Sequence, residues 1–592
     1  MADKTAPVLQ EWAPLSHCLD WHLGQLSWHS RGAQSFTTNE VPNPVNQGGM
    51  AAYRAAEVLF AACDEATEAG TLGDEIFCME MALGLGLFSV QLLDRFKDLC
   101  EANDKDWYGR ITWFATDATA KMLVDARDNN IFIRHQDRVV LGLVDALNPT
   151  TLRRLDNGEL VDLTGKLNAV FHSYLLCVLP GNLYRRRVAA GQTEWTVLMA
   201  QTVLRHPEAL EHFTELSIND VQVLASSQKP EDVARLVPLY PLLDLNLSLA
   251  PVSEQEAVVQ NELSRIADSI EAELSAEAEA PDEAQKSEGA EQKTDSDDAE
   301  RMTWVLHSMG AMIALAKSFE VLAPDGFVFY RDYGPAAAKT ATSSHLYQHY
   351  GSSTAMGINH FALDSWLADG ELPSSPGAAV SKAAGDAQMS IKTRFVSRAE
   401  LPQTRSKFQA LFDREVLAEL SSAVETARKL AADPAQAIEG YRKALALERD
   451  NWVLLTEAGD YALRRAQNAE LAEVLIRESL RINPWYNATA WNCLGDLYWF
   501  ADDIANAKVC FERATASNPE HFLGWFNLSL VARRRGELND AVQLAARALA
   551  VHPGGKGFER LQVSMRECEA LLKRRRELHA EWRKSRAAGS PT

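Results

Sequence analysis

The sequence predicts an α/β domain followed by an all-α repeat solenoid, and three observations support this fold class. From about residue 74 to 250, apolar strand-like runs alternate with helix-like segments, which is the pattern of a parallel sheet with helices on both faces. A glycine-rich turn, Glu80–Ser89, joins the first run to a helix. The last third of the chain repeats one spacing of small and large apolar residues, which is typical of stacked helix pairs.

The bulk composition is that of a globular protein with several domains. The chain has 592 residues, of which 46% are hydrophobic and 24% charged. It contains no run of about 18 apolar residues that would span a membrane, and its N-terminal residues resemble neither a secretory signal nor a transit peptide. Eight scattered cysteines without a Cys-x-x-Cys pair favour a reducing compartment and argue against structural zinc. We therefore expect a cytoplasmic protein.

The first 70 residues are predicted to form an N-terminal extension that ends in a helix, from about Gly49 to Thr67. Pro42 and Pro44 exclude a regular helix just before it. The α/β domain is expected over residues 71–415, with a parallel sheet of at least five strands. The predicted strands are Ile76–Met79, Ile111–Ala115, Val139–Leu143, Ala169–Ser173 and Phe327–Tyr330.

A compositional break interrupts this domain. Residues from about 271 to 300 are mainly Glu, Asp, Ala, Ser, Gln and Lys, without an aromatic residue. Such a segment cannot bury enough apolar surface to offset its loss of entropy on ordering, so it predicts a disordered acidic insert. An acidic interaction arm is the alternative. A second stretch of small residues, Gly377–Gln388, predicts a flexible loop.

Residues 416–555 carry the spacing of tetratricopeptide repeats. One unit has small, large and proline residues at the expected positions, and Trp525, Leu528 and Ala532 repeat part of this pattern about 34 residues later. That unit contains Trp491, Leu494, Gly495, Tyr498, Ala507, Phe511, Ala514 and Pro519. Two less regular units precede it. Residues 556–592 are expected to form a capping helix and a tail. The basic run Lys573–Arg576 predicts a solvated capping face, with a patch for RNA or acidic ligands as the alternative.

Polar side chains at the ends of successive strands predict a cofactor site. In nucleotide-binding α/β folds a glycine turn allows close approach to the backbone, and an acid after the next strand binds ribose hydroxyls. Asp117 follows the second predicted strand. Asp145 follows the third, where it could accept a hydrogen bond from an adenine amino group. A turn or helix cap is the alternative role of each acid. The predicted cofactor-binding residues are Glu80, Ala82, Gly84, Gly86, Asp117 and Asp145.

Five segments occur in an order that resembles one known family. They are Phe36–Val41, Glu80–Gly86, Asp117–Leu123, Leu175–Pro180 and Asp332–Gly334. They are similar to motifs of the MidA family of class I S-adenosylmethionine-dependent methyltransferases: its F-T-T loop, E-x-G-x-G-x-G turn, acid-Ser-Pro-x-Leu segment, N-E-x-L-D-A-L-P motif and late D-Y-G. The resemblance covers roughly residues 20–415. It implies a Rossmann-like methyltransferase domain with S-adenosylmethionine as cofactor. The family includes a mitochondrial complex I assembly factor that methylates an arginine.

The sequence differs from the family's pattern at several positions. Ala82 stands where the turn has its first glycine, Ser173 and Tyr174 stand where the family has Asn and Glu, and Cys177 replaces an Asp. Methyl transfer needs an aligned acceptor, which is mainly a positioning task. The candidates for orienting that acceptor or removing its proton are His172, Tyr174, Asp332 and Tyr333. A buried core histidine is the alternative for His172. His345, His349 and His360 are expected to be loop histidines without a metal.

Three functions are compatible with these observations. The first is an S-adenosylmethionine-dependent methyltransferase that N-methylates a protein, with arginine as one acceptor, recruited through the tetratricopeptide repeats. The second is a non-catalytic scaffold or assembly factor that combines a degenerate methyltransferase fold with the repeats. The third and weakest is an RNA methyltransferase, because the net charge of −22 disfavours nucleic-acid binding.

Overall fold

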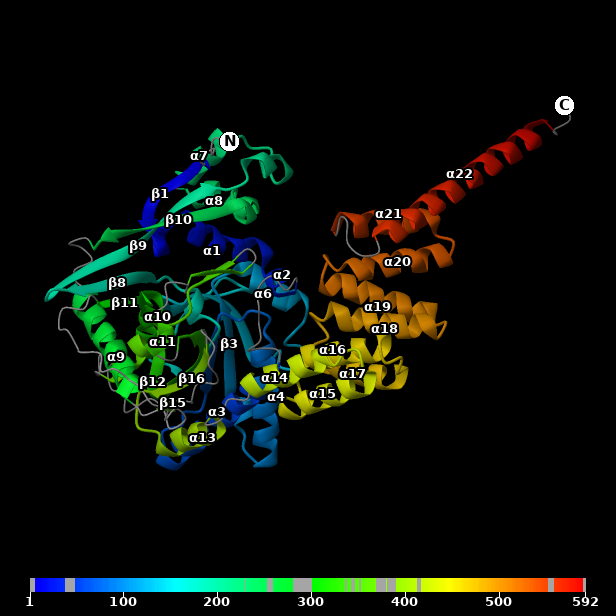
Figure 1. Ribbon diagram of the computed structural model, residues 1–592. Helices are drawn as coiled ribbons and strands as arrows, with labels where there is room; N and C mark the ends of the chain where they lie inside the picture. Colours follow the sequence, from blue (N-terminus) through cyan, green and yellow to red (C-terminus); the bar gives the residue numbers. More distant parts are fainter. Residues whose placement is uncertain are drawn as a thin grey trace, which may run out of the picture. The chain divides into compact units, whose positions relative to one another are not determined.

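The computed structural model describes residues 6–37, 48–227, 229–252, 259–279, 301–335, 338–341, 347–350, 353–368, 379–380, 390–412, 417–551 and 558–588. The chain forms two compact units (Figure 1). The first comprises Met1–Ser35, Glu40–Val45 and Ala51–Ala418, and the second comprises Phe36–Asn39, Asn46–Met50 and Glu419–Thr592.

The first unit is built on a nine-stranded mixed sheet in the order β15-β16-β12-β7-β2-β3-β4-β5-β6. Its five central strands run parallel, and they confirm the five predicted strands. They are β2 (Ile76–Met81), β3 (Ile111–Asp117), β4 (Val139–Asp145), β7 (Leu167–Ser173) and β12 (Leu322–Gly334). The chain runs from β2 outward to β4 and then returns to β7 on the other side of β2, so the strand order reverses between β2 and β7.

Both edges of the sheet carry antiparallel strands, which the sequence did not predict. At each edge a later segment of the chain pairs antiparallel with β4 or β12, and a further short strand pairs antiparallel with that segment. These strands are β5 (Asn148–Arg154), β6 (Leu160–Asp162), β15 (Ala379–Val380) and β16 (Ser390–Ser397).

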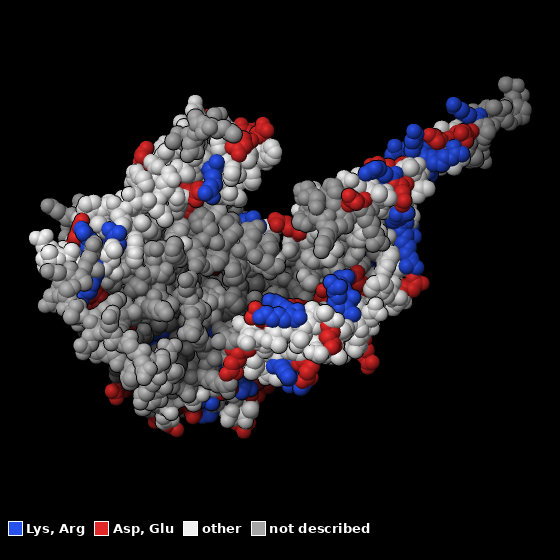
Figure 2. All heavy atoms as spheres, viewed as in Figure 1, with Lys and Arg blue, Asp and Glu red and all other residues white. Residues whose placement is uncertain are grey.

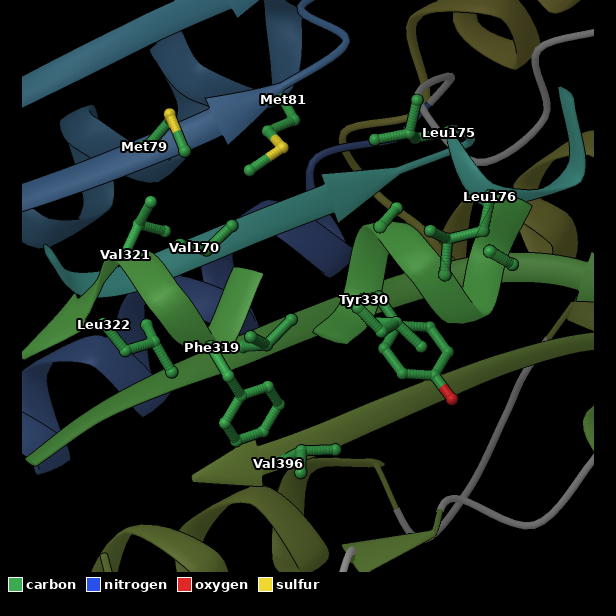
Figure 3. Packing of buried hydrophobic residues seen from close by; sticks show 14 of the residues in the cluster. Met79, Met81, Val170, Leu175, Leu176, Phe319, Val321, Leu322, Tyr330 and Val396 are labelled. Carbon is green, nitrogen blue, oxygen red and sulfur yellow. The ribbon is translucent and has the colours of Figure 1, made fainter. Parts of the chain in front are cut away.

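Helices cover both faces of this sheet, as the sequence predicts. On one face α10 (Met309–Val321) packs over a core that includes Val170 and Tyr330 (Figure 3). On the other face α4 (Leu87–Ala102) and α13 (Pro402–Phe412) bring aromatic rings onto the strands, such as Phe88 against Phe171 at a centroid distance of 6.0 Å. The central strands are apolar on both sides, because both of their faces are buried. The predicted helix near residues 49–67 is α3 (Met50–Ala69).

A second, five-stranded antiparallel sheet was not predicted. Its strands are β1 (Val8–Pro14), β8 (Asn182–Ala189), β9 (Gln192–Leu204), β10 (Leu243–Pro251) and β11 (Arg301–His307). The predicted β/α alternation up to residue 250 is therefore wrong after β7. The hairpin β8–β9 turns at Ala190 and Gly191, both with positive φ, and an Ala-Gly pair is a weaker hairpin signal than Asn-Gly.

The acidic segment is helical in its first part. Helix α9 (Gln260–Glu279) includes residues 271–279, which the composition had assigned to the disordered insert. The guanidinium of Arg186, 8% exposed, binds Asp268 and Glu271 with N–O distances of 2.6 Å, while Leu263 and Ile270 are fully buried. The composition of the acidic segment alone cannot reveal that Arg186, on a distant strand, pairs with it. The rest of the predicted insert, and Gly377–Gln388 apart from β15, lie outside the described residues.

The remaining elements of the first unit are short, except for α1 (Leu19–Arg31). They include α2 (Gln34–Thr37), α5 (Trp107–Arg110), α6 (Ala120–Asp128), α7 (Ile218–Ala225), α8 (Pro230–Ala234), α11 (Ala338–Ala341), α12 (His360–Ala368), β13 (Gln348–Tyr350) and β14 (Ser353–Ala355). The predicted loop that carries Pro42 and Pro44 lies outside the described residues. Among the helices that the structure describes, none is long and apolar enough to cross a membrane.

The second unit contains stacked helix pairs. They are α14 (Leu417–Lys429), α15 (Pro434–Leu447), α16 (Trp452–Arg464), α17 (Ala469–Ile482), α18 (Ala488–Phe500), α19 (Ile504–Ser517), α20 (Phe522–Arg534) and α21 (Leu538–Val551). Successive repeats share contacts: the indole N–H of Trp491 donates to the Pro484 carbonyl at 2.8 Å, and that of Trp525 donates to the Pro519 carbonyl at 2.7 Å. A side chain at position 495 would collide with the Phe511 ring, which explains why this repeat position is occupied by glycine.

The last helix, α22 (Phe558–Ala588), begins on the solenoid and then extends into solvent. Leu561 and Cys568 are buried in the core of the unit, whereas the residues from Glu569 onward are largely exposed. Lys and Arg side chains gather along this helix (Figure 2). The predicted capping helix is present, and its basic run lies on an exposed segment.

Candidate functional site

A strained glycine turn follows β2, at the point where the strand order reverses. Ala82, Gly84 and Gly86 have φ values of 59°, 53° and 73°. The Leu83 N–H donates to the Thr116 carbonyl of β3 at 2.9 Å, which fixes the turn against the neighbouring strand. Helix α4 begins directly after Gly86, and no side chain among the described residues caps its N-terminus. Its first N–H groups therefore point out of the carboxyl end of the sheet with a partial positive charge.

A buried polar chain holds the base of this turn. The indole N–H of Trp113 donates to the Ser89 hydroxyl at 2.7 Å, and that hydroxyl donates to the Glu80 carboxylate. All three side chains are inaccessible to solvent. Burial raises the pKa of Glu80 to about 8, although the Ser89 hydrogen bond lowers it. The Glu80 carboxyl lies inside the core and, through Ser89, links the end of β2 to the first turn of α4.

Replacing Glu80 by Gln should change how stability depends on pH. Folded Glu80, with its pKa of about 8, keeps a proton that the unfolded chain, with a pKa of 4.5, has lost. The free energy of unfolding should therefore fall as pH rises through this window, by up to about 1.4 kcal/mol per pH unit. Glu80→Gln keeps an acceptor for Ser89 and removes this dependence. Urea unfolding from about pH 5 to about pH 8 should show that the free energy of unfolding of the variant rises relative to that of the wild type as the pH increases.

The exposed Glu159→Gln serves as the matched control, and its curve should run parallel to that of the wild type. A Glu80→Gln curve parallel to the wild type would contradict a carboxyl that is neutral in the folded state.

Asp117, at the end of β3, is connected to the glycine turn. Its side chain is 8% exposed. It accepts hydrogen bonds from the Thr119 N–H at 2.8 Å, the Thr119 hydroxyl and the Gly84 N–H, and His29 of α1 lies close enough to lower its pKa. Burial is the larger effect and raises the pKa of Asp117. Sequence reasoning missed His29, because only the fold brings α1 to this strand end.

Asp145 lies at the end of β4, next to β3 in the sheet. Its carboxylate is exposed and accepts the Leu147 N–H at 2.9 Å. The two predicted acids therefore follow neighbouring parallel strands, and Asp145 also forms the turn contact that is the alternative role of a lone acid.

Two tyrosines lie at the carboxyl ends of β7 and β12. Tyr174 has a φ of 62°, which is rare for a bulky residue, and its N–H donates to the Arg331 carbonyl at 3.2 Å. Its ring meets that of Tyr333 edge to face, with 4.4 Å between centroids. Ala82 and Tyr174 thus place left-handed, non-glycine residues after the two strands that flank the switch point. Such strain is concentrated at functional sites.

His172 lies on the opposite face of the sheet from Glu80. It pairs with Met81 in the ladder, and both face α10, where its Nε2 is 3.0 Å from the Ser318 hydroxyl. Because Ser318 donates its proton to the Ala314 carbonyl, the histidine Nε2–H must donate to Ser318. Burial lowers the pKa of His172 to about 3. At neutral pH it is an uncharged side chain of the core.

Asp332 organises the loop after β7. Its carboxylate is fully buried and accepts the backbone N–H groups of Leu176 at 2.6 Å, Cys177 at 3.2 Å and Tyr333 at 2.8 Å. Burial raises its pKa to about 6, and these hydrogen bonds oppose the rise. The D-Y-G segment therefore joins β12 to the short 3-10 helix Leu176–Val178.

The predicted loop histidines are distributed differently. His360 is buried, and burial lowers its pKa. His345 and the side chain of His349 lie outside the described residues. Within the described part of the chain, no three His, Cys, Asp or Glu side chains gather as metal ligands do.

Comparison with known proteins identifies one repeat and several weak structural similarities. The tetratricopeptide repeat family model matches residues 488–521, which confirms the most regular predicted unit. No curated protein matches the chain. A Burkholderia thailandensis COG1565 superfamily member, described as a candidate methyl transferase and bound to S-adenosyl-homocysteine, is 13% identical. The alignment covers 62% of this chain and 74% of that one, with a TM-score of 0.35.

Two further solved structures are similar to parts of the chain. An uncharacterised COG1565 superfamily protein from Burkholderia thailandensis is 12% identical over 65% of this chain and 87% of that one, with a TM-score of 0.35. The MamA protein is 20% identical over 29% of this chain and 97% of that one, with a TM-score of 0.23.

Proposed function

We propose that the first unit binds S-adenosylmethionine at the glycine turn and transfers its methyl group to a nitrogen of a protein substrate. The observation that carries this proposal is the turn itself. Ala82, Gly84 and Gly86 keep positive φ values between β2 and the uncapped α4, at the switch point of the sheet, with Asp117 tied to the turn through Gly84. Ligands of open α/β sheets bind at such switch points.

The chemistry of these groups fits the cofactor. The uncapped N-terminus of α4 offers N–H donors to a carboxylate such as that of the methionine moiety. The Asp117 carboxylate accepts three hydrogen bonds, and a carboxylate has about four acceptor positions, so it retains capacity for a ribose hydroxyl. Gly86 has a φ of 73°, which favours glycine, so the turn presents bare backbone there. When bound, the cofactor supplies an activated methyl group on sulfur.

The protein's own residues would position the acceptor rather than react covalently. Tyr174 and Tyr333 are the aromatic groups at the switch point, and an aromatic face can attract a cationic nitrogen before it loses its proton. His172 and Asp332 contribute structure, since their hydrogen bonds are internal. The resemblance to the MidA family supports arginine as the acceptor. The tetratricopeptide repeats support recruitment of a peptide segment.

A non-catalytic scaffold is the second candidate function. It is favoured by the same internal hydrogen bonds, because neither His172 nor Asp332 is directed to solvent. Ala82 in the turn also adds a methyl group where backbone approach is expected to be close. In this alternative, the repeats bind a partner and the first unit binds no methyl donor.

Isothermal titration with S-adenosylmethionine distinguishes the two functions. The full chain should bind with a dissociation constant on the order of micromolar, and Asp117→Ala should lose at least about tenfold in affinity. Asp162→Ala is the matched control, because Asp162 makes the same pair of contacts, to the N–H and hydroxyl of Thr164, at a remote turn. No heat with the wild type would remove the methyltransferase proposal.

Methyl transfer itself can be followed separately. Radiolabelled methyl donor and the full chain are added to a lysate of cells that lack this protein. Label in a protein band supports protein methylation, label in RNA replaces it with the RNA alternative, and binding without label favours the scaffold.

A further inference from the structure

The antiparallel sheet of the first unit ends in a long, regular strand with an open edge. Strand β10 pairs with β9 through nine consecutive residues, from Leu243 opposite Leu204 to Pro251 opposite Thr196, without a register shift. Within the described part of the chain, β9 is the only strand that pairs with it. An edge of this kind presents a row of backbone N–H and C=O groups that can extend the sheet.

Three of the other sheet edges of this unit are blunted, while β11, the remaining edge strand of the antiparallel sheet, is a regular strand that begins with the charged Arg301. The nine-stranded sheet ends in β6, of 3 residues, and β15, of 2 residues, and very short edge strands resist pairing. Strand β1 has register shifts on either side of Gln10, and bulges have the same protective effect. The β10 edge has neither feature.

The side chains of β10 protect its edge only at one end, where Pro251 is the last residue of the strand. Its sequence, LDLNLSLAP, contains no Lys, Arg or Glu, and its one charge, on Asp244, is paired with Arg205 at 3.0 Å. Leu245 and Leu249 pack partly against the core around Trp21, while Leu247 between them is 55% exposed. The inward apolar row of the strand is therefore covered at its ends and open at its centre.

Strand β10 is complementary to itself. In an antiparallel pairing of two copies about a two-fold axis through Leu247, Leu247 lies opposite Leu247 and Leu245 opposite Leu249. Asp244 then lies opposite Ala250, so the two copies bring no like charges together. Because opposite residues of an antiparallel pair point to the same face, the two leucine rows form one continuous apolar strip. Such an isologous contact closes after two subunits.

We propose that β10 is a homodimerisation edge, at which a second copy of this chain extends the five-stranded sheet into a continuous ten-stranded sheet. This inference is independent of methyl transfer, since it rests only on the pairing, burial and charge of β10. The occupant is a second copy because the pairing of β10 with itself covers Leu247 and opposes no like charges.

Sedimentation equilibrium of the full chain tests this dimer. The wild type should show a monomer–dimer equilibrium. Leu247→Lys places two ammonium groups opposite each other and should weaken dimerisation at least about tenfold. Met302→Lys is the matched control, because Met302 is 58% exposed on β11, another strand of the same sheet, and it should leave the equilibrium unchanged. A monomer at all concentrations, or a dimer insensitive to Leu247→Lys, would overturn the proposal.

A cysteine placed on the two-fold axis gives an independent measurement. The proposed pairing puts the two Leu247 Cβ atoms about 5 Å apart, close to disulfide range, and all eight native cysteines are buried. With oxidised glutathione, Leu247→Cys should give a covalent dimer, while Ser248→Cys, which faces Asn246 across the pairing, should not. Equal cross-linking of the two variants, or none, would exclude this register. Circular dichroism of each variant verifies that it is folded.

Discussion

Replacing Gly334 by Ala should destabilise the first unit by about 3 kcal/mol or more. A Cβ at this position would collide with the carbonyl of Ile358 and lie 2.7 Å from both its carbonyl carbon and its nitrogen. The contact is fixed on both sides, because the Ile358 N–H donates to the Tyr333 carbonyl at 2.7 Å. A methyl group there can be accommodated only by separating two backbone segments. The glycine of the D-Y-G motif is therefore a packing requirement.

Urea unfolding of the full chain, followed by circular dichroism, measures this change. Gly109→Ala is the control: it lies in the same unit, and a Cβ there would meet nothing within 4 Å, so its effect should stay within about 0.5 kcal/mol. Equal stability of Gly334→Ala and Gly109→Ala would show that Ile358 does not pack on β12.

Replacing Asp332 by Ala should cost about 3 to 5 kcal/mol. The carboxylate accepts the N–H groups of Leu176, Cys177 and Tyr333, and its side chain is fully buried. Removing it leaves three backbone donors without their acceptor. Asp332→Asn keeps one acceptor oxygen and turns an amide group toward the remaining donor, so it should cost less than Ala but remain destabilising.

The same pair of variants separates a structural from a catalytic role. If Asp332 is a positioning residue, its replacement should lower both the affinity for the methyl donor and the stability of the protein. Asp332→Asn should then be intermediate between the wild type and Asp332→Ala in both measurements. A fully stable Asp332→Asn protein that binds the donor but transfers no methyl group would contradict this assignment and restore Asp332 as a proton acceptor. Asp162→Ala again provides the control for a carboxylate in a remote turn.

The pattern of apolar residues and glycines within short segments of the sequence predicted those elements that are specified by neighbouring residues. The run Ile76–Met81, the glycine turn and α4 follow one another within 27 residues, from Ile76 to Ala102, so apolar runs and glycine positions suffice to place them. The tetratricopeptide unit at residues 488–521 was likewise found from spacing, because each helix pair packs mainly on its neighbours.

The second sheet escaped sequence analysis because its pairings are remote. Asn182 of β8 pairs with His307 of β11, and Val8 of β1 pairs with Val203 of β9. Nothing within either segment identifies such a partner. The acidic helix α9 was missed for the same reason, since Arg186 neutralises it from a distant strand.

The sequence by itself predicted a strand, a glycine turn and a helix, and it placed acids after the next two strands. Only the tertiary structure decided what each polar group does there. Glu80 and His172 lie on neighbouring strands, yet they face opposite sides of the sheet, and burial shifts the pKa of each toward its neutral form. Asp117 reaches the turn, while the fully buried carboxylate of Asp332 accepts backbone N–H groups of the loop after β7. Protonation and hydrogen-bonding partners depend on burial by remote segments, which no local pattern encodes.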